Sequence, residues 1–136
     1  MREIKFRLYN KKTKKMYGWE NLCKMPAALS ILNDGEDNEK WSCFMQYTGL
    51  KDKNGKEIYE GDIDADDYNN LSVICYIEKY GAYCAVPLEL YLHEDYENEV
   101  VYSHGYDCYF HNVTPKKYLN IIGNIYENPE LLEESK

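Results

Sequence analysis

Four aspartates, Asp62, Asp64, Asp66 and Asp67, follow one another at spacings of one or two residues. Alternating carboxylates resemble the beginning of a calcium-binding loop, in which side-chain oxygens surround the ion. A complete loop also requires glycine at its sixth position and a bidentate glutamate at its twelfth. Those positions hold Asp67 and Val73 here. We therefore interpret the segment as a solvated acidic strand and expect no metal in it.

His104, Cys108 and His111 bring three potential zinc ligands into one short stretch. A structural zinc site needs four ligands in two close pairs. His93 or a distant cysteine would have to complete this one. We expect instead that the three residues stand in a tyrosine-rich loop without a metal.

The five cysteines raise the question of nucleophilic catalysis, because a thiol beside a histidine base can attack a substrate. No sequence signature places a cysteine beside a histidine, and no two cysteines have C-x-x-C spacing. Most stand in apolar segments, as Cys75 does, which favours reduced thiols packed as small apolar side chains. Phosphate-binding and dinucleotide-binding loops are missing as well. The sequence thus indicates no catalytic residue and no cofactor, and nothing in it supports an enzyme.

The segment from Tyr47 to Ile63 is rich in glycine, lysine and tyrosine and could bind a partner. Its candidate surface residues are Tyr47, Lys51, Lys53 and Tyr59. Turn geometry explains the glycines equally well, because Asn-Gly at 54–55 favours a tight turn between two strands. Both interpretations remain open at this point.

Charge is unevenly distributed along the chain. The net charge is −8, but residues 1–15 alone carry +6, so the remainder carries −14. The seven basic residues of this segment are Arg2, Lys5, Arg7, Lys11, Lys12, Lys14 and Lys15. They could attract a nucleic-acid backbone, or they could simply solvate a hairpin turn. Conversely, carboxylates at 57–67, 89–99 and 127–134 could imitate DNA if they aligned on one face.

Alternation of apolar and polar residues predicts the strands that must position these side chains. It is clearest at 3–9 and 119–126, and it continues through 82–92. Residues 71–80 are apolar on both faces, which predicts a central strand covered on both sides. Residues 41–48 and 99–103 also indicate strands, and the acidic residues 94–99 indicate a loop.

The order of these signals predicts one domain over 1–136, a usual size for a single domain. It begins with a hairpin at 1–19 and continues through a variable segment at 20–40, where any helix should begin near Pro26. A barrel region at 41–126 follows. A helical turn at 129–134 comes last, with Asn128 as its N-cap.

Neither a membrane span nor a secretory signal is evident. No apolar run approaches the length that a bilayer requires. The first residues are charged and lead into no apolar stretch. We expect a cytoplasmic protein that does not associate with membranes.

Three blocks of sequence resemble the YopX family of bacteriophage and prophage proteins. The first comprises MREIKFR at 1–7 and KTKKMY at 12–17; the others are MQYTGLKDKNGKEIYEGDI at 45–63 and IIGNIYENPELL at 121–132. The resemblance implies a mainly-β fold, an SH3-like barrel decorated with extra strands and one or two short helices. It implies no known activity and offers no functional residue to transfer. Asp64 departs from the family pattern, which usually has an apolar residue there.

These observations favour a non-enzymatic protein-interaction module. Its partner would be a host or phage protein, or a second copy of the chain, since tyrosine-rich surfaces are common at interfaces. Nucleic-acid binding through the basic N-terminal hairpin and acidic imitation of DNA are the alternatives.

Overall fold

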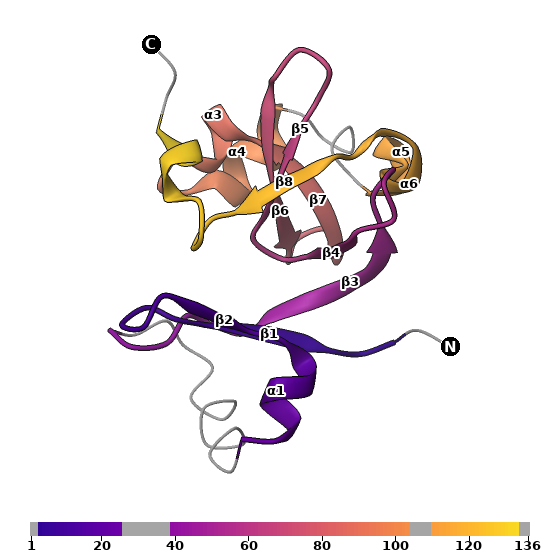
Figure 1. The fold of residues 1–136 in the computed structure, drawn as a ribbon. Helices are drawn as coiled ribbons and strands as arrows, with labels where there is room; N and C mark the ends of the chain where they lie inside the picture. The colour runs from indigo at the N-terminus through magenta and orange to yellow at the C-terminus, as the bar shows by residue number, and fades with distance from the viewer. Residues whose placement is uncertain (1–2, 26–38, 104–109, 134–136) are drawn as a thin grey trace. The chain divides into compact units, whose positions relative to one another are not determined.

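The computed structural model describes residues 3–25, 39–103 and 110–133, and its chain forms two compact units, Met1–Tyr47 and Thr48–Lys136 (Figure 1). It is mainly β, with two antiparallel four-stranded sheets. One sheet has the order β2-β1-β3-β4 and the other the order β7-β6-β5-β8. The predicted mainly-β class is therefore confirmed.

The first unit is built on a hairpin of β1 (Phe6–Asn10) and β2 (Lys15–Tyr17). The Asn10 side chain closes its turn, because Asn10 Oδ1 accepts hydrogen bonds from the amides of Lys12 at 3.0 Å and Thr13 at 3.1 Å. Lys14, with φ of 59°, completes the reversal. The hairpin expected at the N-terminus is thus present, and its turn carries the cluster of lysines.

Helix α1 (Trp19–Cys23) follows the hairpin, earlier than expected. The prediction that any helix in this region begins near Pro26 is wrong. The extended backbone of Gly18 ends the strand and starts the helix, which buries Leu22. Pro26 itself lies outside the described residues.

Strand β3 (Met45–Lys51) runs from the first unit into the second. It pairs with β1 through Phe6↔Gln46 and Arg7↔Met45. The strand expected from residue 41 therefore begins later, and Trp41 makes only an isolated bridge to Asn10.

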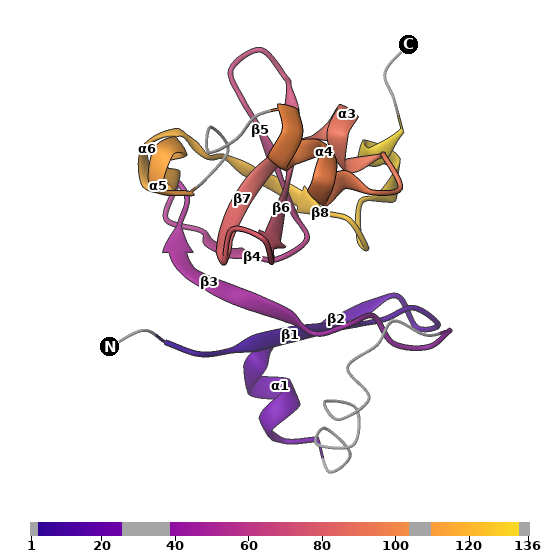
Figure 2. The ribbon, with the colours of Figure 1, turned by 180° about the vertical axis from the view of Figure 1, so that it is seen from behind.

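The second unit contains β4 (Glu57–Tyr59), β5 (Asp62–Ala65), β6 (Leu71–Ile77), β7 (Ala82–Pro87) and β8 (Ile121–Asn124). The strands β5, β6, β7 and β8 form one sheet, which Figure 2 shows from behind. Apolar side chains cover both of its faces. One cluster comprises Ile63, Val73, Cys75, Ile77, Cys84, Val86 and Val100. The other comprises Ile58, Ile74, Ala85, Phe110, Leu119 and Ile121. The prediction that β6 is a central strand covered on both sides is confirmed.

Where the structure describes this unit, five short helical segments accompany the sheet: α3 (Leu88–Tyr91), α4 (Tyr96–Ser103), α5 (Phe110–Val113), α6 (Pro115–Tyr118) and the 3₁₀ turn η1 (Pro129–Leu132). With α1, they exceed the one or two helices expected. None of the helices among the described residues has the length and apolar character that crossing a bilayer requires.

Two of these helices replace predicted strands. The alternation over 82–92 ends at Pro87, which cannot donate a ladder hydrogen bond and begins α3 instead. The strand predicted at 99–103 is wrong, and the loop predicted at 94–99 holds only for residues 94–95, because α4 covers 96–103. Tyr96 and Val100 are four residues apart, so one helical face brings both against the apolar cluster of the sheet.

Asn128 occupies the N-cap position of η1, and Pro129 begins the helical turn, both as predicted. The Asn128 side chain makes no capping bond to η1; instead, Asn128 Oδ1 accepts the amide of Asn124 at 3.1 Å. Asn124 Oδ1 in turn accepts the amides of Tyr126 at 3.0 Å and Glu127 at 2.8 Å. These bonds hold the turn between β8 and η1.

A substitution at Gly123 tests the packing of this turn. Because glycine has no side chain, the Asn128 side chain can occupy the space next to position 123. A Cβ at position 123 would lie 2.7 Å from Asn128 Cγ. We expect Gly123→Ala to lower the free energy of unfolding by about 1–3 kcal/mol, as overpacking does. Urea denaturation measures the change.

Gly18→Ala is the control, because no atom lies within 4 Å of a Cβ built there. It should cost less than about 1 kcal/mol, as expected for an N-terminal cap position without a side-chain bond. Equal losses for the two variants would contradict the proposed packing of Asn128.

Candidate functional site

The tip of the β3–β4 hairpin is organised by one buried carboxylate, that of Asp52, whose exposed fraction is 1%. Its Oδ1 accepts the amides of Asn54 and Lys56, both at 2.9 Å. Its Oδ2 accepts the amide of Ile121 at 2.9 Å. Asp52 thus closes the turn that Asn54-Gly55 predicts, where Gly55 has φ of 83°, and fastens this turn to the sheet.

The four surface candidates of the central block lie in different surroundings. Lys51 and Lys53 are exposed, and Tyr59 is half-buried. The prediction that Tyr47 lies on the surface is wrong, because only 5% of its surface area is exposed. Tyr47 lies on the same face of β3 as buried Met45, and the Lys5 ammonium lies 4.8 Å from the centre of its ring. A binding role for the other three stays a prediction.

Three of the four aspartates in the 62–67 segment, Asp62, Asp64 and Asp66, accept backbone amides. Asp62 and Asp64 are buried, not solvated as predicted. Asp62 Oδ2 accepts the amide of Tyr59 at 2.8 Å, and Asp64 Oδ1 accepts that of Asn120 at 2.7 Å. Within the described residues, no group of three or more acidic, histidine or cysteine side chains is arranged to hold a metal ion.

Asp52 and Asp64 hold consecutive amides, those of Ile121 and Asn120. Burial raises the pKa of Asp64, the bond from Asn120 lowers it, and repulsion from Asp66 and Asp52 raises it further. Asp64 therefore serves as an amide acceptor at an electrostatic cost that comes mainly from its burial. The sheet depends on both side chains for the position of β8.

Asp66 shapes the turn between β5 and β6. Its Oδ1 accepts the amides of Tyr68 and Asn70, each at 2.8 Å, and its Oδ2 accepts the Asn70 side-chain amide at 3.1 Å. The amide of Asn70 is the main cause that lowers the pKa of Asp66. Tyr68 stands at the tip of this turn with 86% of its surface exposed.

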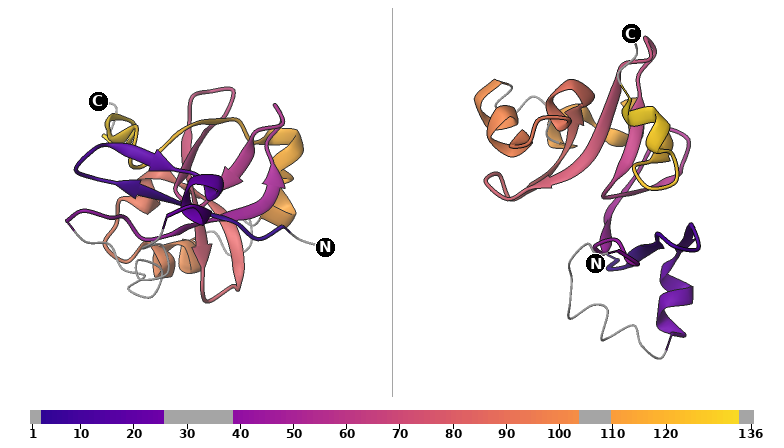
Figure 3. Two further views of the ribbon diagram at one scale, coloured as in Figure 1. Left: turned by 60° about the horizontal axis from the view of Figure 1, so that its bottom comes forward. Right: turned by 90° about the vertical axis from the view of Figure 1, so that its left-hand side faces the viewer.

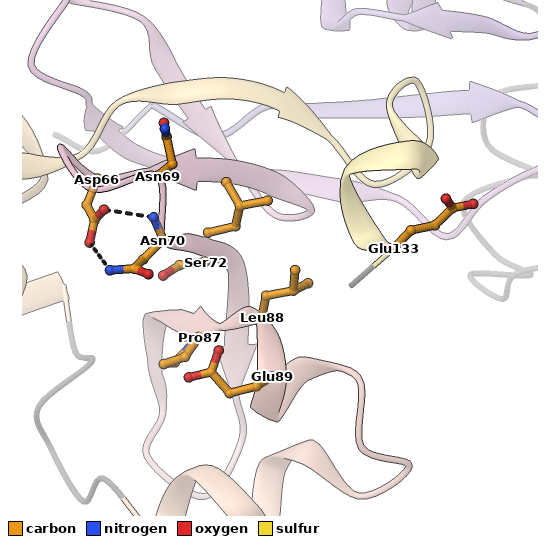
Figure 4. A pocket seen from close by; sticks show the side chains of 9 residues that line it. Asp66, Asn69, Asn70, Ser72, Pro87, Leu88, Glu89 and Glu133 are labelled. Carbon is orange, nitrogen blue, oxygen red and sulfur yellow. Dashed lines mark hydrogen bonds between the residues drawn. The ribbon is translucent and has the colours of Figure 1, made fainter. Parts of the chain in front are cut away.

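A pocket of about 670 Å³ opens beside this turn (Figure 4). Its walls come from the β5–β6 turn, the start of β6, the junction of β7 with α3, and the residue after η1. The lining residues are Asp66, Asn69, Asn70, Leu71, Ser72, Pro87, Leu88, Glu89 and Glu133. Every charged residue among them is acidic, while Leu71, Pro87 and Leu88 supply apolar surface. Such a pocket suits a cationic group carried on an apolar stem.

The predicted histidine–cysteine group cannot be placed as a set. His104 and Cys108 lie outside the described residues, as does the side chain of His111. Cys75 and Cys84, by contrast, lie opposite each other on β6 and β7 and are buried in an apolar cluster. Their position is that of small apolar side chains, as predicted.

Sequence reasoning did not find the pocket. The pattern Asp66–Asn70 contains a signal for the turn, because aspartate and asparagine favour such side-chain-closed turns. Glu89 and Glu133, however, come from α3 and the end of η1, and no local pattern connects them.

Comparisons with known proteins agree with this fold. The model of the YopX protein family matches residues 5–133. The crystal structure of protein EF1440 from Enterococcus faecalis is similar with a TM-score of 0.58 and 26% sequence identity. The similarity covers 98% of this chain and 100% of that one. No curated protein is detectably similar.

Replacement of Asp52 tests its role as anchor. Asp52→Ala should lower the free energy of unfolding by about 2–4 kcal/mol, because it leaves amides without their acceptor in a buried site. Asp52→Asn, which keeps one acceptor oxygen, should fall between alanine and wild type. Urea denaturation gives the values.

Asp67→Ala is the matched control. The Asp67 carboxylate is 90% exposed and lies 3.8 Å from Lys53 Nζ. Its loss should cost less than about 0.5 kcal/mol, as for other surface ion pairs. A cost for Asp52→Ala as small as this would contradict the anchoring role.

Asp64 and Asp66 should affect stability with opposite pH dependence, because their pKa values shift in opposite directions from 3.8. The raised pKa of Asp64 means that its ionisation opposes folding. Relative to Asp64→Asn, wild-type stability should therefore fall as pH rises from 3.8 through the folded-state pKa. The lowered pKa of Asp66 stabilises the fold above 3.8, and this contribution disappears as pH falls through the folded-state pKa.

Urea denaturation of wild type, Asp64→Asn and Asp66→Asn between pH 3 and 8 measures both effects. Asparagine retains an oxygen that can accept the backbone amides, so each variant removes the charge but keeps those bonds. At position 66 it also removes the acceptor of the Asn70 side-chain amide, a loss that does not depend on pH. Parallel pH profiles for the two variants would refute the assignment.

Proposed function

The chain belongs to the YopX family, and we propose that it is a non-enzymatic interaction module that binds a partner protein through the acidic pocket of its second unit. The observation that carries this proposal is the composition of the pocket. Acidic side chains from three separate elements, Asp66, Glu89 and Glu133, line a cavity with apolar surface between them. The partner would insert an arginine or lysine side chain.

The chemistry of arginine and lysine fits both parts of this lining. Their aliphatic stems can pack against Pro87 and Leu88, and their charged heads can reach Glu89 or Glu133 (Figure 4). Asp66 has both oxygens engaged by the turn, so it contributes negative charge and holds the wall in place.

Tyr68 supports the proposal because it is the most exposed large hydrophobic side chain among the described residues. An aromatic ring beside a pocket is a common anchor in protein interfaces. The bonds from Asp66 fix the backbone that carries Tyr68 and Asn70, so little conformational entropy remains to be lost on binding.

We also propose a more specific fold class for the second unit. We interpret the strands of the second unit as an SH3-like barrel with added helices. The curved sheet (Figure 3) and the change of register between Ile63 and Asp64 support this, because bulges bend strands toward closure.

The two alternative functions receive different support. Acidic imitation of DNA would need the carboxylates at 57–67 on the surface, and Asp62 and Asp64 are buried. Nucleic-acid binding by the N-terminal hairpin is favoured by the exposure of Lys12, Lys14 and Lys15 around its turn. It remains the second candidate.

Short peptides that carry arginine, each paired with the same peptide carrying glutamine, test the pocket. We expect only arginine peptides to bind in fluorescence anisotropy. Glu89→Gln combined with Glu133→Gln should weaken binding about fivefold, the size expected for two partly exposed ion pairs. Tyr68→Ala should weaken it independently of charge.

Glu78→Gln combined with Glu94→Gln is the matched control, since both glutamates are exposed, outside the pocket lining, and remove the same charge. Equal weakening by the two double variants would show a response to net charge alone. That result, or binding of the glutamine peptides with the same affinity, would reject the pocket. A doubled mass in sedimentation that is lost in the pocket variant would identify a second copy as the partner.

A further inference from the structure

Most of the basic side chains of the second unit lie on two adjoining segments. Residues 48–136 contain seven basic and eighteen acidic side chains, a net charge of −11. Five of the seven basic residues nevertheless lie on two adjoining segments, the β3–β4 hairpin tip and helix α6. We name these five and the neighbouring tyrosine the lysine–tyrosine surface: Lys51, Lys53, Lys56, Lys116, Lys117 and Tyr118.

Backbone contacts hold the two segments together. The amide of Lys53 donates to the carbonyl oxygen of Leu119 at 2.9 Å, next to the end of α6. The side-chain amide of Asn54 donates to Asn120 Oδ1 at 2.9 Å. With the bond from Ile121 to Asp52, these contacts place the hairpin tip beside α6, as Figures 1 and 2 show from opposite sides. Hydrogen bonds within the fold therefore hold the hairpin tip and α6 next to each other.

All six side chains reach solvent. The five lysines are exposed, and Tyr118 is 58% exposed. The Lys117 ammonium lies 5.4 Å from the centre of the Tyr118 ring, so charge and aromatic face are presented together. Lys116 and Lys117 stand in the last turn of α6, a position that favours cations.

The acidic groups nearby do not cancel this surface. Asp52 and Asp64 are buried and accept amides, and Lys53 is 3.8 Å from Asp67, which offsets one of the five positive charges. Glu57, next to Lys56, is half-buried. The remaining lysines leave an excess of positive charge on a unit that is otherwise strongly acidic.

We infer that the lysine–tyrosine surface binds single-stranded nucleic acid. Lysines neutralise successive phosphates of such a strand, and an exposed aromatic ring stacks on an unpaired base. A duplex keeps its bases stacked inside, so it could use the lysines but not Tyr118. An acidic peptide, likewise, has no flat base to place on the ring. This inference does not depend on the acidic pocket, which lies on other elements.

Fluorescence anisotropy of a labelled twelve-nucleotide thymidine strand, measured over a range of KCl concentrations, tests the inference. Lys116→Gln combined with Lys117→Gln should weaken binding by about tenfold at low salt and reduce the slope of log K against log [salt] by about 1.4, the value for two phosphate contacts on a single strand. Tyr118→Ala should weaken binding about tenfold with little change of slope, and Tyr118→Phe should retain it.

The matched control is Lys12→Gln combined with Lys15→Gln, which removes the same charge from exposed positions in the first unit. It should leave the affinity unchanged. Loss of binding in this control but not in the α6 variant would overturn the inference and assign binding to the N-terminal hairpin. Absence of binding at low salt would also overturn it, as would equal affinity for a duplex or for polyglutamate.

Discussion

The fold of the second unit depends on carboxylates that are buried and satisfied by backbone amides. Asp52 binds two amides of its own turn and one of β8, and Asp64 binds the neighbouring amide of β8. A buried carboxylate is stable only if hydrogen bonds replace the water that it loses. This requirement fixes the β3–β4 tip and the start of β8 in one arrangement. The lysine–tyrosine surface depends on the bonds of Asp52, whereas the pocket wall depends on amide bonds to Asp66, which is exposed.

The need to satisfy buried carboxylates distinguishes the acidic residues that stabilise the fold from those that line the pocket. The acidic residues with the clearest sequence pattern, Asp62 and Asp64, lie inside and hold the chain. Two of the acids that line the pocket, Glu89 and Glu133, belong to no sequence pattern, whereas the third, Asp66, closes the turn that forms one wall. Negative charge is thus used for folding near β5 and is available for recognition near α3 and η1. A net charge of −11 does not prevent a basic surface, because most of the lysines of this unit are gathered on two segments.

Sequence reasoning predicted the strands and turns that depend on residues close together in the chain. Apolar residues on both faces of 71–80 identified β6 as a covered central strand, and Asn54-Gly55 identified the hairpin turn. It failed at α4, because Val100 and Val101 resemble a strand and only their packing against the sheet selects a helix. It also failed at Tyr47, whose burial depends on the face that β3 turns inward. The pocket and the lysine–tyrosine surface join residues far apart in sequence, so no window along the chain could contain them. One domain over 1–136 remains a prediction.

The central claim is that one small β unit carries two separate binding surfaces of opposite charge. Amide chemical-shift mapping by NMR tests it most directly, with an arginine peptide and a thymidine strand added in turn. The peptide should perturb residues 66–72 and 88–89, and the strand should perturb residues 51–56 and 116–118. Perturbation of one common set by both ligands, or of neither set, would contradict the claim.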